Sequence, residues 1–278
     1  MNESLKLCVQ EIKKLPTLPV IAQEILDLVS NNVTSVGRIE RVVENDPAIS
    51  AKILSVANSV FFGTKTRTRT LDNAIMRIGF DNVKSIALGI SLMTVLQEGN
   101  GSRVFDYHRI YNHSVTVGFL ARLLARRLKL QFSEEIMMNG MLHDLGYLIL
   151  NKYFPERYRD VLLSFGKEHS LLDAEKKVLE FTHADIGNWL AEKWNLPNTI
   201  VDTTLYHHAP SRAQRNVKPA AVVHLADYIT TNKMLSPTEK DPNYPFDHAS
   251  LEILNITEED LRAFEAEITG NEYFAKII

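Results

Sequence analysis

The sequence contains a single cysteine, Cys8, so it cannot form an internal disulfide bond, and it suits a reducing compartment. It also lacks a long hydrophobic run. The longest apolar stretch, around Ile86 to Leu96, is shorter than the roughly 20 residues that a membrane-spanning helix needs. The first residues, Met1 to Lys6, do not show the charged and then apolar layout of a signal peptide. Together these absences predict a cytoplasmic protein with no membrane association.

Positive charge is not in excess either. The sequence has 31 lysines and arginines against 34 aspartates and glutamates, a formal net charge of −3, so no overall basic field draws it to phosphate backbones or anionic lipid. The densest basic group, which we expect to be a solvated helix face rather than a binding site, consists of Arg122, Arg126, Arg127 and Lys129. We therefore expect no nucleic-acid partner.

Proline is absent between Pro47 and Pro155, and this long segment is poor in strand-like patterns. Apolar residues recur there at helical spacing, for example through Phe119, Leu123 and Leu128. With 45% hydrophobic residues over 278 positions, the chain can bury a substantial core. These features predict an all-α fold.

Helix-start signals and one glycine-containing polar segment predict where helices begin and where the chain divides into lobes. Asp46 before Pro47 is typical of a helix start, and Asp81 is expected to cap a later helix. The run from Glu98 to Ser102 is the best internal boundary. The predicted parts are an N-terminal helical lobe (residues 1–100), a second helical lobe with a candidate metal site (101–235), and a C-terminal extension with a terminal helix (236–278).

Histidines and aspartates form an ordered series in the second lobe. The stretch from Gly140 to Gly146 places an imidazole and a carboxylate side by side at the end of an apolar helical run. The whole candidate series is His113, His143, Asp144, His183, His207, His208 and Asp227. Neutral imidazole and carboxylate are ligands that zinc, iron, nickel and manganese accept, and a carboxylate can bridge two ions. The series predicts a metal site built from separate helices.

Each candidate also has a structural interpretation. His143 and Asp144 can form a buried hydrogen-bonded pair without a metal, and histidines at helix ends, such as His183, His207 and His208, can act as caps or exposed polar residues. The other histidines are expected to be structural or exposed, and these are His108, His169, His224 and His248. Asp185 is expected to be solvated, and Trp189 and Trp194 to pack in the core.

Several motifs resemble the HDOD family, an HD-related signalling domain of bacteria. They are Leu15-Pro16-Thr17-Leu18-Pro19, the helix opened by Asp46-Pro47 that runs into Asn58-Ser59, and Trp194-Asn195-Leu196-Pro197. The order of the histidine and aspartate series is similar to the HD superfamily of metal-dependent phosphohydrolases, and in particular to HD-GYP phosphodiesterases, which cleave cyclic di-GMP. The resemblance implies an HD-like multi-helix bundle with an N-terminal helical lobe.

The resemblance also implies a pair of divalent ions, for which iron, manganese, nickel and zinc are the candidates. One ion would be held by His113, His143, Asp144 and Asp227. Asp144 would bridge to a second ion, held also by His183, His207 and His208. If the centre is catalytic, Asp144 is the candidate catalytic residue. Asn58 and Ser59 are either a partner or ligand contact or, as we favour, a helix-end turn bonded to the backbone.

The sequence departs from HD-GYP phosphodiesterases at three places. Ala209-Pro210-Ser211-Arg212 follows His208 in place of Gly-Tyr-Pro, Tyr147 stands where those enzymes have a lysine, and Arg109 stands where some have a glutamate ligand. These departures favour a regulatory signal-transduction module that acts through a signalling protein or nucleotide. The alternative is a metal-dependent phosphohydrolase acting on a cyclic dinucleotide or nucleotide. The oligomeric state is open.

Overall fold

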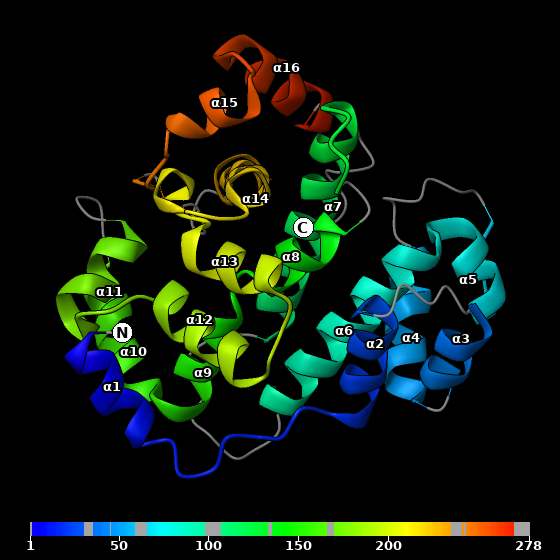
Figure 1. Ribbon diagram of the computed structural model, residues 1–278, viewed down its shortest axis with the longest axis horizontal. Helices are drawn as coiled ribbons and strands as arrows, with labels where there is room; N and C mark the ends of the chain where they lie inside the picture. The colour runs from blue at the N-terminus through cyan, green and yellow to red at the C-terminus, as the bar shows by residue number, and fades with distance from the viewer. Residues whose placement is uncertain are drawn as a thin grey trace.

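The fold is built from helices alone in the part of the chain that the structure describes (Figure 1). The computed structural model describes residues 2–30, 36–44, 46–58, 66–97, 107–132, 135–165, 170–234, 241 and 243–269. The α-helices are α1 (Glu3–Gln10), α2 (Val20–Ser30), α3 (Val36–Glu44), α4 (Pro47–Ala57), α5 (Leu71–Ile78), α6 (Phe80–Gln97), α7 (Tyr107–Arg127), α8 (Ile136–Leu142), α9 (Leu145–Tyr153), α10 (Pro155–Ser164), α11 (Leu171–Leu179), α12 (His183–Lys193), α13 (Asn198–Tyr206), α14 (Val217–Ile229), α15 (Ala249–Leu254) and α16 (Glu258–Thr269). A 3-10 turn, η2 (Pro210–Arg212), and a π-helical turn, η3 (Thr230–Met234), complete the list. The predicted all-α fold is confirmed.

Local sequence signals explain several helix boundaries. The Asp46 carboxylate accepts hydrogen bonds from the backbone N–H groups of Ala48 and Ile49, which confirms that Asp46 caps α4. The expected cap at Asp81 was wrong. Helix α6 already begins at Phe80, so Asp81 lies in its first turn, where it forms an ion pair with Lys84.

Asn58 ends α4 by bonding to the backbone. Its side-chain oxygen accepts from the Thr68 N–H at 2.7 Å, and its side-chain nitrogen donates to the Thr68 carbonyl at 2.8 Å. Asn58 therefore has the turn role that was favoured from sequence. Ser59 and the predicted boundary at residues 98–102 lie outside the described residues.

Helix α6 connects two groups of helices. On one side it packs against α2, α3, α4 and α5, and on the other against α8 and α9 (Figure 1). Because it is covered on both sides, it is buried along most of its length and lacks a continuous polar face. The second group, α7 to α14, contains every residue of the histidine and aspartate series.

Helix α1 does not lie beside α2. Figure 1 shows α1 next to α10 and α11, at the opposite side of the molecule from α3 to α5. The Asn2 side chain donates to the Glu180 carbonyl, and Arg157 forms an ion pair with Glu11 at 2.7 Å. The chain after α1 stays near the second group of helices, since Trp194 at the end of α12 donates its indole N–H to the Pro16 carbonyl. The N-terminal residues therefore reinforce the helices of the second group.

Glycines allow the helices around the series to approach closely. A Cβ atom on Gly140 in α8 would lie 2.7 Å from the Gly118 Cα in α7. A Cβ on Gly146 in α9 would lie 2.7 Å from the carbonyl carbon of His183, and one on Gly187 in α12 would lie 2.9 Å from the Gly146 nitrogen. Real side chains do not tolerate contacts this short. Glycine at these positions therefore lets α9 reach α12 at His183.

The C-terminal helices have an apolar cluster of their own. Helices α14, α15 and α16 pack with α7 around residues such as Leu124, Leu225 and Phe264. Helix α16 lies within the predicted C-terminal extension. No single helix of the described residues has the length and apolar character to cross a bilayer. The pair α5 and α6 meets those two criteria only when taken together across a 114° bend.

Candidate metal centre

The seven predicted residues come together from five places in the chain. His113 lies in α7, His143 and Asp144 lie between α8 and α9, and His183 is the first residue of α12. His207 and His208 follow α13, and Asp227 lies in α14. Their ring nitrogens and carboxylate oxygens form overlapping groups in which the ligand atoms lie within 4.8 Å of one another. Helix packing thus assembles the series, as the sequence analysis required.

One group consists of two histidines and two aspartates. His113 Nε2 lies 3.0 Å from Asp227 Oδ1 and 3.5 Å from Asp144 Oδ2. His143 Nε2 lies 3.2 Å from Asp144 Oδ2 and 3.8 Å from Asp227 Oδ1. Two ring nitrogens and two carboxylate oxygens therefore face a common point. We call this group the two-histidine position.

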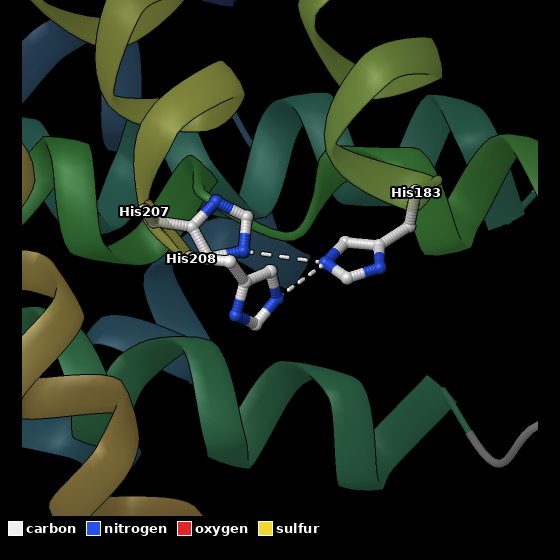
Figure 2. A group of neighbouring side chains, drawn as sticks. All are labelled: His183, His207 and His208. Carbon is white, nitrogen blue, oxygen red and sulfur yellow. Dashed lines mark hydrogen bonds between the residues drawn. The ribbon is translucent and has the colours of Figure 1, made fainter. Parts of the chain in front are cut away.

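A second group consists of three histidines. His183 Nε2 lies 3.2 Å from His207 Nε2 and 3.1 Å from His208 Nε2 (Figure 2). Asp144 Oδ1 lies 3.4 Å from His183 Nε2 and 3.6 Å from His207 Nε2. We call this group the three-histidine position. Since Asp144 Oδ2 faces the first group and Oδ1 the second, one carboxylate lies between the two.

Hydrogen bonds at Nδ1 determine how three of the rings present their lone pairs. Nδ1 of His143 lies 2.6 Å from the Gly140 carbonyl, and Nδ1 of His207 lies 2.8 Å from the Thr204 carbonyl. Nδ1 of His183 lies 2.8 Å and 3.0 Å from the two carboxylate oxygens of Glu175. Because these oxygens only accept, we assign the proton to Nδ1 in each neutral ring. The Nε2 lone pairs then point into the centre.

Such an arrangement fits a metal ion. With their protons on Nδ1, the rings of His183 and His207 turn two Nε2 lone pairs toward each other at 3.2 Å, and a cation between them would relieve this repulsion. His143 Nε2 is fully buried and has no hydrogen-bond partner among the described residues, although the Asp144 carboxylate is near. Imidazole nitrogen and carboxylate oxygen are the donors that divalent transition metals accept. The donor set therefore suits divalent ions at both positions.

Burial and neighbouring charge shift the pKa values of these groups strongly. Burial lowers the pKa of His143, but the carboxylates of Asp144 and Asp227 outweigh burial and raise that pKa to about 10. Burial raises the pKa of Asp144, but His143 and His183 outweigh it and hold that pKa below its ordinary value. Burial, reinforced by charge on His143, lowers the pKa of His207 to about 3. The carboxylates thus favour positive charge in the centre, whereas the crowded imidazoles do not all accept protons.

Two residues next to the ligand atoms were missed in the sequence. Glu175 in α11 is fully buried, and Tyr244, which follows η3, donates its hydroxyl to Asp227 Oδ2 at 2.7 Å. One feature of the sequence could have revealed Glu175. It shares a helix face with Leu171 and Leu179, where an apolar residue is expected. Tyr244 lies among prolines in an irregular stretch, which gives no periodic signal.

The residues that were expected to lie outside the site are also placed. His224 is buried and uses both ring nitrogens, since Nδ1 lies 2.7 Å from the His207 carbonyl and Nε2 accepts from the Asp247 N–H at 3.0 Å. It is therefore a structural histidine. His108 and His248 are exposed, and His169 lies outside the described residues.

The prediction for Asp185 was wrong. This carboxylate is half-buried and accepts from the N–H and hydroxyl of Thr182, which completes a capping box at the start of α12. The predicted core role of Trp194 is confirmed, since it is only 6% exposed, and Trp189 packs against the core.

The positions that depart from HD-GYP phosphodiesterases lie at or near the centre. The ring of Tyr147 stacks on His183, with a centroid separation of 4.0 Å and an angle of 22° between the planes. Pro210 to Arg212 form the 3-10 turn η2, and Arg109 is exposed on α7, one turn before His113. Burial raises the pKa of Tyr147 well above its ordinary value, so its side chain is a neutral phenol beside the imidazole.

Comparison with known proteins identifies relatives over most of this fold. The family model of the HDOD domain matches residues 15–210. An uncharacterized protein of Treponema pallidum (strain Nichols) is 26% identical over 214 residues, which are 75% of this chain and 40% of that protein. The chain thus spans well under half the length of that curated relative.

Solved structures with similar folds cover almost the whole chain. An HDOD domain protein of unknown function from Geobacter sulfurreducens superposes with a TM-score of 0.82 and 21% identity, over 99% of this chain and 97% of that one. A protein of Shewanella amazonensis SB2B, provisionally described as a phosphohydrolase, has a TM-score of 0.73 and 22% identity over 96% of each chain. One from Marinobacter aquaeolei VT8, provisionally described as a signal transduction protein, has a TM-score of 0.77 and 22% identity over 95% of this chain and 62% of that one.

Proposed function

Because this chain belongs to the HDOD family, we propose that it is a regulatory signal-transduction module whose second helical lobe holds a pair of divalent metal ions. It acts by binding a signalling protein or a nucleotide rather than by turning over a substrate. The provisional description of the Marinobacter relative as a signal transduction protein supports this role. The proposed compartment is the cytoplasm, with no nucleic-acid or membrane partner.

The observation that carries the metal proposal is the position of Asp144. Its two oxygens lie 3.2 Å from His143 Nε2 and 3.4 Å from His183 Nε2, so each faces a different group of ring nitrogens. His113, His143 and Asp227 would hold one ion with Asp144. His183, His207 and His208 would hold the other with the same carboxylate.

Tyr147 supports a regulatory role over a hydrolytic one. In the HD-GYP phosphodiesterases that this sequence resembles, a lysine at this position is expected to contact substrate phosphate as a point charge. Here the position carries a neutral phenol whose ring is stacked on His183. The side chain therefore offers a flat apolar surface beside the three-histidine position instead of a cation.

One alternative function, phosphoester hydrolysis, also has specific support. The complete series, with a shared carboxylate, is also what a metal-dependent phosphohydrolase acting on a cyclic dinucleotide or nucleotide needs, and the relative from Shewanella is provisionally described as a phosphohydrolase. When bound, a metal pair lowers the pKa of a water molecule and stabilises charge on phosphoryl oxygens. In that case Asp144, between the two positions, is the candidate catalytic residue.

Metal content tests the proposal directly. We expect mass spectrometry of the untagged, anaerobically purified chain to find about two iron, manganese, nickel or zinc ions per chain. Asp144→Ala should lose most of this metal, because it removes the carboxylate that both positions share. Circular dichroism should show that the variant keeps its helices. A stably folded wild-type chain that takes up no metal from any of the four ions would overturn the proposal.

A phosphoester panel separates the two functions. The regulatory module should release no product from cyclic dinucleotides, cyclic mononucleotides or aryl phosphoesters when it is loaded with each metal in turn. Metal-dependent turnover that disappears in Asp144→Asn, with the helical content unchanged, would establish the hydrolase alternative instead.

A further inference from the structure

A buried carboxylate lies directly behind the three-histidine position. Glu175 in α11 is 0% exposed and accepts three hydrogen bonds. Two come from His183, from its backbone N–H at 2.8 Å and its ring Nδ1 at 2.8 Å. The third comes from the hydroxyl of Tyr158 at 3.2 Å. Among the described residues, no lysine or arginine forms an ion pair with this carboxylate.

Packing alone does not account for such a group. Burying a carboxylate is strongly unfavourable unless an opposite charge or strong hydrogen bonds offset the lost hydration. Glu175 takes a core position between Leu171 and Leu179 on the inner face of α11, where an apolar side chain would fill the space. The carboxylate therefore has a role that an apolar residue cannot perform, and its partner is the ring of His183.

The two proposed metal positions differ in the hydrogen-bond partners of their histidine Nδ1 atoms. The Nδ1 atoms of His143 and His207 face neutral backbone carbonyls of Gly140 and Thr204. Among the three candidate ligand rings whose Nδ1 partner the structure describes, only His183 has a carboxylate facing Nδ1. A carboxylate behind a ligating histidine fixes the ring orientation and tautomer and makes its other nitrogen a stronger donor.

We propose that Glu175 is a positioning residue that strengthens metal binding at the three-histidine position, and that it makes the two positions unequal in affinity. The inference rests on the metal centre of the proposed function. Glu175 touches no metal in this scheme. It acts through His183, by holding the proton on Nδ1 and directing the Nε2 lone pair toward His207, His208 and Asp144.

Glu175→Gln tests the charge with little change in shape. The amide oxygen can stay on the side of His183, where it accepts from the backbone N–H and from Nδ1–H. The amide NH2 then faces Tyr158, whose hydroxyl can rotate to accept. Two variants serve as controls. Tyr158→Phe removes one hydrogen bond but keeps the charge, and Glu192→Gln makes the same chemical change at an exposed residue of α12.

The experiment is a zinc titration of the metal-free 278-residue chain against a chromophoric chelator. Wild type should show two dissociation constants. In Glu175→Gln one of them should rise roughly 10- to 100-fold while the other stays unchanged, as expected when an outer carboxylate is lost from one site. Both constants should stay at wild-type values in the two controls. Glu175→Asp keeps the charge but withdraws it from His183, and should shift the same single constant by a smaller factor.

The outcomes separate this inference from the proposed function. A wild type that binds no zinc, iron, manganese or nickel overturns both. Two constants that are both unchanged in Glu175→Gln overturn the inference and leave the metal centre intact. Equal weakening of both constants in Glu175→Gln and Glu175→Asp also overturns it, because a general loss of packing would act on the whole centre.

A measurement on the wild-type chain covers the case in which the substitutions prevent folding. Long-range proton–nitrogen NMR of the zinc-loaded chain should show His183 protonated at Nδ1, with that proton shifted further downfield than the Nδ1 protons of His143 and His207. A Glu175 that only fills space, without a strong hydrogen bond to the ring, would not produce this difference. A His183 ring protonated at Nε2, or with an ordinary Nδ1 proton shift, would refute the assigned role.

Discussion

The contact between Gly146 and His183 gives a sharp prediction for Gly146→Ala. A Cβ at this position would lie 2.7 Å from the carbonyl carbon and 3.0 Å from the Cα of His183. Both are backbone atoms, which cannot swing aside as the end of a side chain does. Helices α9 and α12 must separate to admit the methyl group, and overpacking of this kind costs about 3 kcal/mol at the upper end of its usual range.

A second glycine provides a matched control. Gly37 is the second residue of α3, as Gly146 is of α9, and a Cβ there meets nothing within 4 Å. Gly37→Ala should therefore record only the gain in helix propensity, which is at most about 1 kcal/mol. The same gain partly offsets the clash in Gly146→Ala, which leaves a net destabilisation of about 2 kcal/mol.

Thermal unfolding, monitored by circular dichroism with a chelator present, gives the Tm of both variants without a contribution from bound metal. A change of 1 kcal/mol shifts the Tm of a chain of this size by roughly 2–4 °C, so Gly146→Ala should melt about 4–8 °C below wild type. Gly37→Ala should melt at or slightly above the wild-type Tm. If the two variants melt together, the close contact between α9 and α12 does not constrain the fold, and the reasoning fails.

Three further predictions concern the candidate centre, and a fourth concerns Cys8 in α1. His113→Ala and His208→Ala each remove a ligand from a different position, so each variant should keep about one ion per chain by mass spectrometry, and loss of both ions from either would contradict two separable positions. Adding zinc at 100 times its dissociation constant should stabilise the wild-type chain by about 2.7 kcal/mol in a denaturant titration, since the ion binds only the folded state; an unchanged midpoint would count against a folded-state site. Tyr147→Phe keeps the ring stacked on His183 and should leave the metal content unchanged; a loss of metal would show that the hydroxyl is needed. Burial raises the pKa of the Cys8 thiol from 9.0 to about 11, so the neutral thiol stabilises the fold below pH 9 and this contribution is lost as the pH rises toward 11; at pH 8 a thiol reagent should modify the folded chain far more slowly than the guanidinium-unfolded chain, and equal rates would contradict the burial of Cys8.

Much of the candidate site could be predicted because its candidate ligands are histidines and aspartates, which are rare in the core of a helical fold. His143 and Asp144 stand out at the end of an apolar run, and the order of the remaining ligands matches a known series. Their convergence could be expected, but the way Asp144 directs one oxygen to each group depends on backbone conformation between α8 and α9. Sequence spacing does not specify that conformation.

Other features could not be predicted, for separate physical reasons. The link through Leu15 to Pro19 is extended, so it allows α1 to pack on either group of helices. The contacts of Glu11 with Arg157 and of Pro16 with Trp194 select the second group. Asp81 looked like a cap because its residue type favours that position, but α6 begins one residue earlier. Tyr244 reaches Asp227 through an irregular stretch, where no periodicity reports which side chains point inward.

Helix α14 holds part of the candidate metal centre, and it lies beyond the region that the family model matches. The family match ends at residue 210, whereas Asp227 lies in α14 and its hydrogen-bond partner Tyr244 lies further along the chain. A protein shortened to the matched region would keep both histidine groups and the carboxylate between them, yet it would lose an anionic oxygen that lies 3.0 Å from His113 Nε2. The smallest unit that contains the whole candidate centre is therefore larger than the region that the family model matches.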